Sequence, residues 1–247
     1  MKGILICGYN GRMGRCLTDY LEKNDCSVYG AAGYGKRYSS APYPVFTSLD
    51  EIDFPIDAAV DFTGVEACGG VAKWCAEMKV PLAACVTGTG EDYEEYLREI
   101  SGEIPVFRAV NLSRAAHTMK ELICLAAEEL ADYDIELTET HHKGKKDIPG
   151  GTAAEMAEIL RQRVGGRIVL NRESGVLREK GEIGVHSLRG GGVFGEHELF
   201  FFGEDEMLSV THRVFGREAF ARGAVEAVHL ITDKQNGYYT MEDIINE

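Results

Sequence analysis

The chain has 247 residues, of which 45% are hydrophobic and 27% charged, and its formal net charge is -14. This composition predicts a globular, soluble protein with material for one large domain or two modest ones. The excess of acidic residues argues against binding to the phosphate backbone of nucleic acids, because the negative electric field of the chain would repel the phosphates.

The N-terminal run and the cysteines indicate where the protein works. Gly8 and Gly11 interrupt the first apolar run before a signal-peptide core or a membrane span could form, so we expect neither export nor a membrane anchor. The seven cysteines are odd in number and include no C-x-x-C pair. We therefore expect buried thiols in a reducing cytoplasm.

The first half of the chain alternates between strand and helix patterns. Apolar runs of strand length occur at 3–7, 26–32, 58–62, 81–86 and 105–110. Apolar residues at helical spacing follow three of these runs, at 12–23, 65–78 and 92–100. Such alternation predicts a parallel sheet with crossover helices, which is an α/β domain of the Rossmann type.

From about Asn111 onward the pattern changes. A long helix is predicted at 113–131 and a strand at 135–140, and a helix at 218–231 comes near the end. Between them, the stretches 183–203 and 206–215 are rich in β-forming residues and punctuated by glycine turns. These features predict a second, smaller α+β domain with a mixed sheet.

A further helix is predicted after the basic loop that follows the strand at 135–140. Thr152 and Glu155 have the spacing of a capping box, and Pro149 shortly precedes them. The residues expected on its buried face are Ala153, Met156, Ala157, Leu160 and Val164. The basic loop therefore ends at the N-terminus of a helix.

The turn after the first strand carries a dinucleotide-binding pattern. Gly8, Gly11 and Gly14 form G-x-x-G-x-x-G, with Asn10 where the usual fingerprint has its second glycine. Glycines allow a tight turn and close approach of the backbone to a phosphate, and the helix that follows directs its free N–H groups at the ligand. Its place between a strand and a helix favours a dinucleotide site over a simple turn.

The acidic residue that would bind the ribose 2′-hydroxyl of NAD is missing. No Asp or Glu occurs between Asp25 and Asp50, and Tyr34 falls near the expected position. Lys36 and Arg37 follow the second strand, where they could meet a 2′-phosphate. This favours NADP over NAD, while use of both cofactors and a solvated loop with two surface charges remain open.

The segment 139–152 reads ETHHKGKKDIPGGT, and five of the six residues from His141 to Lys146 are His or Lys. Histidine exchanges a proton near neutral pH, lysine supplies positive charge or a proton, and Gly-Gly-Thr at a helix start supplies backbone donors for a carboxylate. Together they predict a site for a small polyanion that must be protonated. The plainer alternatives are a core histidine, solvated lysines and a threonine helix cap.

This segment resembles the signature E-x-H-H-x-x-K-x-D-x-P-S-G-T-A of the dihydrodipicolinate reductase family, whose members are 4-hydroxy-tetrahydrodipicolinate reductases. The resemblance extends along the whole chain. It includes the first glycine turn, VDFTG at 60–64, GTG at 88–90, AVNLS at 109–113, SLRGGGVFGEHELFF at 187–201, THRVFGREAFARGA at 211–224 and GYYTMEDI at 237–244.

The resemblance implies a cytoplasmic oxidoreductase of lysine and diaminopimelate biosynthesis. Its reaction is the reduction of 4-hydroxy-tetrahydrodipicolinate, a small cyclic dicarboxylate, to tetrahydrodipicolinate by NADPH or NADH. By the same resemblance, His141 and Lys145 are the proton donors. His142, Gly151 and Thr152 are implied to bind substrate.

The resemblance also implies the cofactor site and the domain organisation. The implied cofactor-binding residues are Gly8, Tyr9, Asn10, Gly11, Arg12 and Met13 at the pyrophosphate, and Gly88, Thr89, Gly90, Ala109, Val110, Asn111 and Leu112 at the nicotinamide end. Residues 1–112 and 217–247 would form the dinucleotide-binding domain. Residues 113–216 would form the substrate-binding domain, whose sheet assembles a homotetramer.

Some positions depart from the family pattern, and other functions remain open. Gly150 stands where the family usually has serine, and Val110 and Arg114 replace more usual neighbours of Asn111. One alternative is another two-domain dehydrogenase of amino acids, similar to homoserine or aspartate dehydrogenase, which would not need the paired histidines. Another is a dinucleotide-binding sensor without turnover, which would bind the cofactor and not oxidise it.

Overall fold

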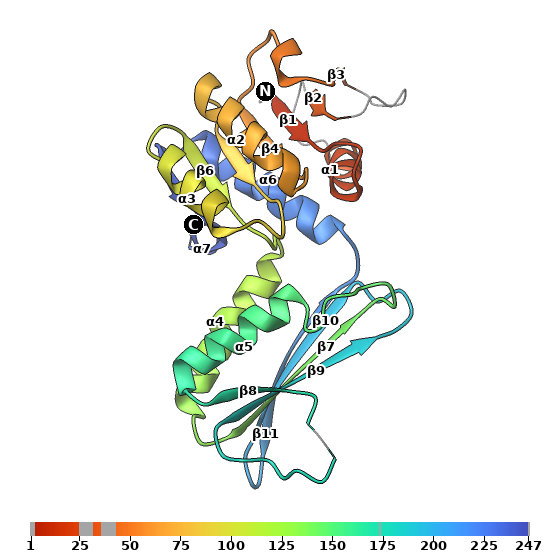
Figure 1. Ribbon diagram of the computed structural model, residues 1–247, viewed down its shortest axis with the longest axis vertical. Helices are drawn as coiled ribbons and strands as arrows, with labels where there is room; N and C mark the ends of the chain where they lie inside the picture. The colour runs from red at the N-terminus through yellow and green to blue at the C-terminus, as the bar shows by residue number, and fades with distance from the viewer. Residues whose placement is uncertain (1–2, 25–31, 36–42, 173, 247) are drawn as a thin grey trace. The chain divides into compact units, whose positions relative to one another are not determined.

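The structure of the chain is a computed structural model that describes residues 3–24, 32–35, 43–172 and 174–246. The chain divides into two compact units (Figure 1). The first unit comprises Met1–Arg114 and Arg217–Glu247, and the second is the continuous segment Ala115–Gly216. The second unit is thus an insertion into the chain of the first.

The first unit contains a seven-stranded sheet in the order β12-β6-β5-β4-β1-β2-β3, and its paired strands are parallel. The strands are β1 (Ile4–Cys7), β2 (Ala32–Tyr34), β3 (Val45–Phe46), β4 (Ala58–Asp61), β5 (Leu82–Ala84), β6 (Pro105–Arg108) and β12 (Gly237–Tyr239). This confirms the predicted Rossmann-type sheet. The strand predicted at 26–32 falls mostly outside the described residues, and the short β3 and β12 were not predicted.

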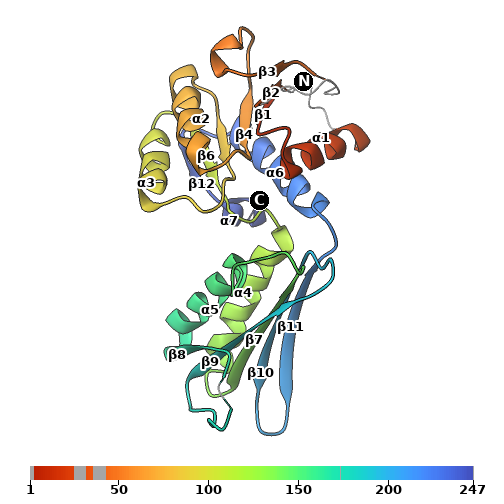
Figure 2. The same cartoon turned by 45° about the vertical axis from the view of Figure 1, so that its right-hand side comes forward.

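Helices cover both faces of this sheet (Figure 2). Helices α1 (Arg12–Lys23), α6 (Glu218–Thr232) and α7 (Met241–Ile245) contribute to one hydrophobic cluster, and α2 (Val65–Met78) and α3 (Glu91–Ile100) contribute to the other. The side chains of β1 alternate between the two clusters, and all four are buried. A strand covered on both faces is continuously apolar, which is why β1 reads as an unbroken apolar run.

The second unit contains a five-stranded mixed sheet in the order β11-β10-β7-β9-β8. Its strands are β7 (Asp134–His141), β8 (Arg167–Leu170), β9 (Glu182–Arg189), β10 (Gly195–Phe202) and β11 (Met207–Val214). Strand β9 runs parallel to β7 and β8, whereas β10 is antiparallel to β7 and β11. The predicted mixed sheet is therefore confirmed, although β8 was not expected.

Helices α4 (Arg114–Glu129) and α5 (Gly151–Val164) lie along one face of this sheet (Figure 2). The cluster beneath them combines Met119 and Ile123 of α4 with Met156 and Leu160 of α5. The sheet contributes every second residue of its strands, which are Ile135, Leu137, Ile183, Val185, Leu199 and Phe201. Because side chains alternate across a strand, the residues between them face away from the helices.

The predicted capping box at the start of α5 is wrong. The helix begins at Gly151, and its N-cap is Gly150, which makes no side-chain cap. Thr152 therefore lies inside the first turn, two positions after the N-cap. Glu155 binds the ammonium of Lys120 on α4 at 2.5 Å. The side chain that was expected to close the cap instead joins the two helices.

Among the described residues, no helix combines the length and hydropathy needed to cross a bilayer. The six cysteines within these ranges are free thiols, and four of them, Cys7, Cys68, Cys75 and Cys85, are buried. Burial raises the pKa of the Cys75 thiol well above its ordinary value, which keeps it protonated and unreactive.

Candidate active site

The turn after β1 lies where the strand order reverses. Strand β1 pairs with β2 on one side and with β4 on the other, and the crevice at such a point is the usual ligand site of a doubly wound sheet. Gly8 has a φ of +76°, and a Cβ there would lie 2.7 Å from the backbone oxygen of Phe62, in the turn after β4. The Gly8 N–H donates to the carbonyl of Tyr34 at 2.9 Å. A side chain at position 8 would therefore collide with the neighbouring turn.

The third glycine of the pattern brings α1 against the turn. A Cβ at Gly14 would lie 2.4 Å from Cα of Tyr9 and 2.5 Å from the backbone oxygen of Gly8. The N-cap of α1 is Gly11, which makes no side-chain cap, so the helix presents its first N–H groups to a ligand. Such a glycine-containing turn beside a helix N-terminus fits the pyrophosphate of a dinucleotide.

The other predicted cofactor residues lie at the same edge of the sheet. Residues 88–90 follow β5, which pairs with β4, and residues 109–112 follow β6, which pairs with β5, so both come from the carboxyl ends of parallel strands on the β4 side of β1. Gly88 has a φ of +78° and Gly90 caps α3, while the Asn111 side chain accepts from the Ser113 N–H at 2.9 Å. Lys36 and Arg37 lie outside the described residues.

A buried arginine that sequence analysis missed joins these turns. Arg108, the last residue of β6, is 8% exposed and forms an ion pair with Glu94 of α3. It also donates to the hydroxyl of Thr89 at 2.9 Å and to backbone carbonyls after β5. Because Arg108 and Glu94 are 14 positions apart, no local sequence spacing indicates the pair.

The basic loop of the second unit is organised by a buried carboxylate. Glu139 of β7 is fully buried, and its two oxygens accept from the guanidinium of Arg189 at 2.7 and 2.9 Å. The same carboxylate accepts from the Gly150 N–H at 3.1 Å and lies 2.5 Å from His141 Nδ1. Arg189 also donates to the carbonyl of Asp147 at 2.5 Å. The pair therefore ties the strand before the loop to the helix after it.

The hydrogen bonds decide the ionisation of Glu139. Burial alone would raise its pKa, but Arg189, Ser187, His141 and the Gly150 N–H stabilise the carboxylate and lower the pKa to about 2. Glu139 is therefore an anion at neutral pH. A fixed anion beside Nδ1 of His141 holds the proton on that nitrogen, so Nε2 is the atom left to exchange a proton.

His141 has three charged neighbours, the anion Glu139 and the cations Lys145 and Arg189. Burial lowers the pKa of His141, the hydrogen bond to Glu139 opposes this effect, and the charges of Lys145 and Arg189 lower it further. The imidazole is therefore mainly neutral near pH 7. A Cβ at Gly195 would lie 3.2 Å from His141 Nε2, so a side chain there would make a tight contact with that edge of the ring.

Lys145 and His141 meet at Gly150. A Cβ on Gly150 would lie 2.9 Å from Lys145 Cε and 3.4 Å from His141 Cε1. A serine at this position would therefore require the Lys145 side chain to shift. The Lys145 ammonium lies 2.7 Å from a carboxylate oxygen of Asp147, and its side chain is 22% exposed. The structure thus brings both candidate proton donors to the start of α5.

The predicted substrate-binding residues divide into two groups. Gly151 and Thr152 form the first turn of α5, where the N–H groups of the helix are available to an anion. The side chain of His142 is oriented differently, because its Nδ1 accepts from the Gly144 N–H within the loop at 3.2 Å. His142 thus supports the loop conformation, while Gly151 and Thr152 directly follow Gly150, to which the side chains of Lys145 and His141 are close.

A row of polar side chains crosses the sheet beneath His141. Strand pairing places His212 of β11, His197 of β10 and Glu139 of β7 side by side. The His197 ring lies 5.5 Å from the His141 ring edge-on and 5.9 Å from the His212 ring in a stacked arrangement. The alternation of β10, in which Leu199 and Phe201 are buried, could have indicated that His197 faces inward too.

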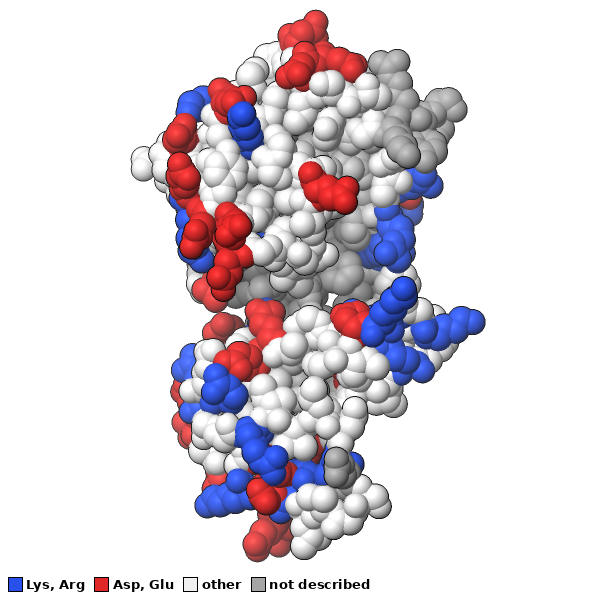
Figure 3. All heavy atoms as spheres, viewed as in Figure 1, with Lys and Arg blue, Asp and Glu red and all other residues white. Residues whose placement is uncertain are grey.

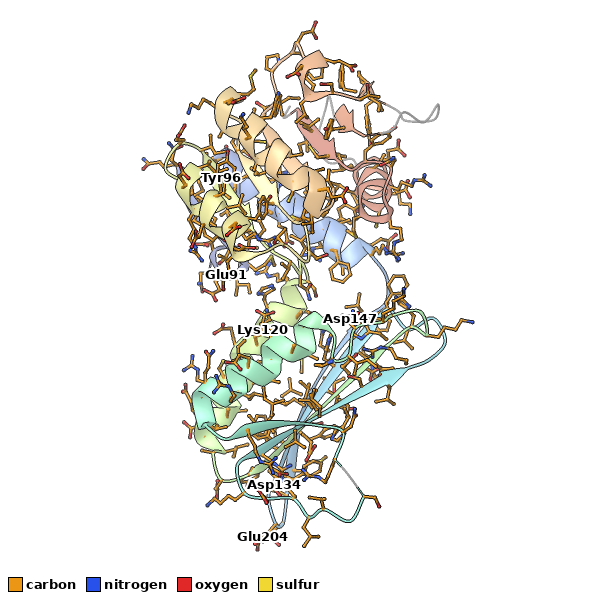
Figure 4. All side chains as sticks on the ribbon, in the orientation of Figure 1. Glu91, Tyr96, Lys120, Asp134, Asp147 and Glu204 are labelled. Atoms are coloured by element: carbon orange, nitrogen blue, oxygen red, sulfur yellow. The ribbon has the colours of Figure 1, made fainter. Side chains whose placement is uncertain are left out.

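Positive charge gathers at the end of the second unit that carries the loops after β7 and β9. Figure 3 shows Lys and Arg side chains over the loops that follow β7 and β9. Figure 4 places Asp147 at this end of the five-stranded sheet, whereas Asp134 and Glu204 lie at the opposite end. Because the net charge of the chain is -14, this cluster is a local reversal that favours an anionic ligand.

Acid is expected to destabilise the second unit through His197. Its pKa is lowered from 6.5 to about 4 because burial disfavours the charged form and His141 and His212 add positive charge nearby. A group with a lowered folded-state pKa contributes stability above its unfolded value and loses it as the pH falls toward the folded value. The free energy of unfolding should therefore fall by about 3 kcal/mol from pH 6.5 to pH 4.

The variant His197→Phe keeps a buried ring and removes the titrating group, so its stability should depend less on pH in this interval. Urea unfolding at several values between pH 7 and pH 4 measures the difference. His229→Gln, on the exposed side of α6, is the matched control and should follow the parent chain. An equal pH dependence in the parent and in His197→Phe would show that another group is responsible.

Comparison with known proteins identifies the family of this chain. The model described as "Dihydrodipicolinate reductase, N-terminus" matches residues 2–112, and "Dihydrodipicolinate reductase, C-terminus" matches residues 115–245. The 4-hydroxy-tetrahydrodipicolinate reductase of Caldanaerobacter subterraneus subsp. tengcongensis is 34% identical over 254 residues, covering 100% of this chain and 99% of that protein. The protein of the same name from Haloarcula marismortui is 34% identical over 248 residues, covering all of both chains.

A solved structure has the same fold. The dipicolinate-bound dihydrodipicolinate reductase from Paenisporosarcina sp. TG-14 superposes with a TM-score of 0.80 at 20% identity, and 99% of each chain is covered. The chain therefore belongs to the dihydrodipicolinate reductase family.

Proposed function

We propose that this chain reduces 4-hydroxy-tetrahydrodipicolinate to tetrahydrodipicolinate with NADPH or NADH, as an oxidoreductase of lysine and diaminopimelate biosynthesis. The observation that carries this proposal is the meeting of His141 and Lys145 at Gly150, in a chain whose other unit bears a dinucleotide-binding turn. The names of the full-length relatives support the same reaction. The first unit would be the dinucleotide-binding domain and the second the substrate-binding domain.

The first unit fits a nicotinamide dinucleotide, which supplies hydride when bound. Residues 8–13 would hold its pyrophosphate, because the absence of a Cβ at Gly8 and at Gly14 lets this turn pack tightly against the turn after β4 and against α1. Residues 88–90 and 109–112 would border the nicotinamide end. A preference for NADPH rests on Lys36 and Arg37, which could pair with a 2′-phosphate.

The second unit would bind the dicarboxylate ring and supply its proton. The backbone N–H groups of Gly151 and Thr152 would bind one carboxylate at the helix start, and His142 would help to hold the substrate. The 4-hydroxyl of the substrate would leave as water, which gives a conjugated ring. Addition of hydride to one carbon of that ring moves electrons to its neighbour, which then needs a proton. Lys145 would donate it, with His141 exchanging its proton through Nε2, the nitrogen left open by Glu139.

One assay tests this function directly. The purified chain is supplied with the condensation product of pyruvate and aspartate semialdehyde, and nicotinamide absorbance is followed with NADPH and with NADH. We expect oxidation of the cofactor only when this product is present. Turnover with homoserine or aspartate instead would favour an amino-acid dehydrogenase, and cofactor binding without oxidation would favour a sensor.

We also propose that the chain works in the cytoplasm as a homotetramer assembled through the sheet of the second unit. The face of this sheet opposite to α4 and α5 carries Leu188, Phe200, Phe202 and Met207. Three of these side chains, those at 188, 202 and 207, are at least 40% exposed. Exposed apolar side chains on a sheet face, set among polar neighbours such as the ion pair of Glu196 and Arg213, are typical of an oligomer interface.

A charge placed on this face is expected to break the assembly. Phe202→Glu and Leu188→Glu should each shift the sedimentation mass from four chains to two or one, because a carboxylate cannot be buried there without a partner. Analytical ultracentrifugation measures the change. Leu122→Glu is the matched control, since Leu122 is 50% exposed on α4, on the other side of the unit. Tetramers in both sheet variants would place the interface elsewhere.

A further inference from the structure

The guanidinium of Arg108 uses all of its hydrogen-bond donors inside the first unit. Its Nε–H donates to both oxygens of Glu94, at 2.9 and 3.1 Å. One terminal nitrogen donates to the carbonyls of Ala84 at 3.1 Å and Val86 at 2.9 Å. The other donates to the Thr89 hydroxyl at 2.9 Å and to Glu94 Oε1 at 2.6 Å. An arginine has five such donors, so none is left for a ligand.

These partners belong to one short stretch of chain. Ala84 ends β5, Val86 and Thr89 lie in the turn that follows, and Glu94 is in the first turn of α3. The Thr89 hydroxyl also donates to Glu94 at 3.2 Å, and the Tyr238 hydroxyl of β12 donates to it at 3.3 Å. Because a guanidinium is planar and rigid, it fixes these groups relative to one another, as a flexible ammonium could not.

The location of this cluster distinguishes it from an ordinary stabilising ion pair. The Arg108 side chain is 7% exposed, and a buried ion pair is often no more stabilising than apolar side chains of similar volume. Hydrogen bonding and charge from Glu94 raise the pKa of Arg108 against the effect of burial, so the cation is kept. Two of its bonds go to groups of the turn itself, the Val86 carbonyl and the Thr89 hydroxyl, so the cation stabilises one conformation of that turn.

Arg108 also stands directly before the second turn of the proposed nicotinamide site. It ends β6, and Ala109 to Leu112 follow it without a break. Ala109 and Leu112 are buried, whereas Val110 between them is 54% exposed. The turn therefore has one side packed against the protein and one side facing outward. One side chain is thus covalently joined to one of the two turns and hydrogen-bonded to the other.

We propose that Arg108 is a positioning residue for the nicotinamide end of the cofactor, which sets the turn 85–90 relative to the turn 109–112 without touching the cofactor itself. This inference rests on the proposed function, because that function assigns both turns to nicotinamide. Loss of the guanidinium should loosen the turns before binding, and the binding of either cofactor must then order them. Cofactor affinity should therefore fall, while the chemical step at saturating cofactor changes little.

The test compares Arg108→Met and Arg108→Lys with the parent chain. NADPH and NADH dissociation constants are measured by nicotinamide fluorescence without substrate, and KM and kcat are measured in the coupled assay. Both variants should raise the dissociation constant of each cofactor at least tenfold and lower kcat less than threefold. Arg98→Met is the matched control, because Arg98 is an exposed arginine of α3 that lies over the ring of Tyr238. It should bind both cofactors as the parent does.

Other outcomes separate the possible failures. A lower melting temperature with unchanged dissociation constants, measured well below the transition, would show that Arg108 only stabilises the fold and would overturn the inference. If Arg108→Met does not fold, Arg108→Lys decides, because it keeps the charge and loses the planar fork. If the parent chain binds NADPH but does not reduce the condensation product, the proposed reaction fails, while the dissociation constants still test Arg108.

Discussion

Replacing Lys145 with alanine is expected to lower kcat by roughly 10² to 10⁴, the range typical of a lost general acid. The ammonium of Lys145 lies beside Gly150, where the proposed substrate carboxylate would bind. The loss should appear in kcat at saturating NADPH, because the residue is not part of the cofactor turns. Steady-state rates at 340 nm measure it.

His141→Gln should lower kcat by a similar factor, because it also removes a group that exchanges a proton. Glutamine can still accept or donate a hydrogen bond, but it cannot exchange a proton near neutral pH. Glu139 would keep its bonds to Arg189 and the Gly150 N–H, so the loop should stay folded.

Lys143→Ala is the matched control for both variants, because Lys143 is an exposed lysine of the same loop. It should retain most of the parent activity. If Lys145→Ala and His141→Gln both turn over at the parent rate, neither residue moves the proton, and the acid must be sought elsewhere in the second unit.

The second large effect is expected from Gly14→Ala. The added Cβ would lie 2.4 Å from Cα of Tyr9, which belongs to the backbone and cannot move aside as a flexible side chain would. Helix α1 must therefore shift away from the turn, at a cost of about 1–3 kcal/mol for an overpacked site. The same shift opens the proposed pyrophosphate cradle, so cofactor affinity should fall by more than tenfold.

Denaturant unfolding and nicotinamide fluorescence measure the two effects of Gly14→Ala separately. Gly69→Ala is the matched control, since Gly69 is exposed in α2 and its added Cβ would meet nothing within 4 Å. That change should stabilise the chain by about 0.5–1 kcal/mol through the better helix propensity of alanine. Parent-like cofactor binding in Gly14→Ala would remove this turn from the proposed site.

The alternating half of the fold could be predicted because its patterns are local. Helix α1 spans the predicted residues 12–23, since its apolar residues recur at helical spacing and a glycine turn marks its start. The short strands β3 and β12 could not be predicted, because two or three residues carry no periodicity. Their pairing with β2 and β6 is decided by the sheet as a whole.

The residues of the candidate site also divide into those that local sequence spacing indicates and those that it does not. The His and Lys side chains of the basic loop lie within a few positions of one another, so their spacing alone indicated a polyanion site. Glu139 and Arg189 are 50 positions apart in the sequence, and Arg108 forms an ion pair with Glu94, which lies on the preceding helix α3. Such pairs depend on strand register and on the packing of α3, which are properties of the folded sheets rather than of any local segment.

The insertion of the second unit fixes the order in which the protein can fold as it is synthesised. The first 114 residues lack α6, whose alanines and valines complete the cluster over β1, β4 and β6, and they also lack the edge strand β12. A nascent chain of that length exposes an apolar sheet face. The ribosome must deliver the whole inserted unit before the first one can close, so the second unit is free to fold first.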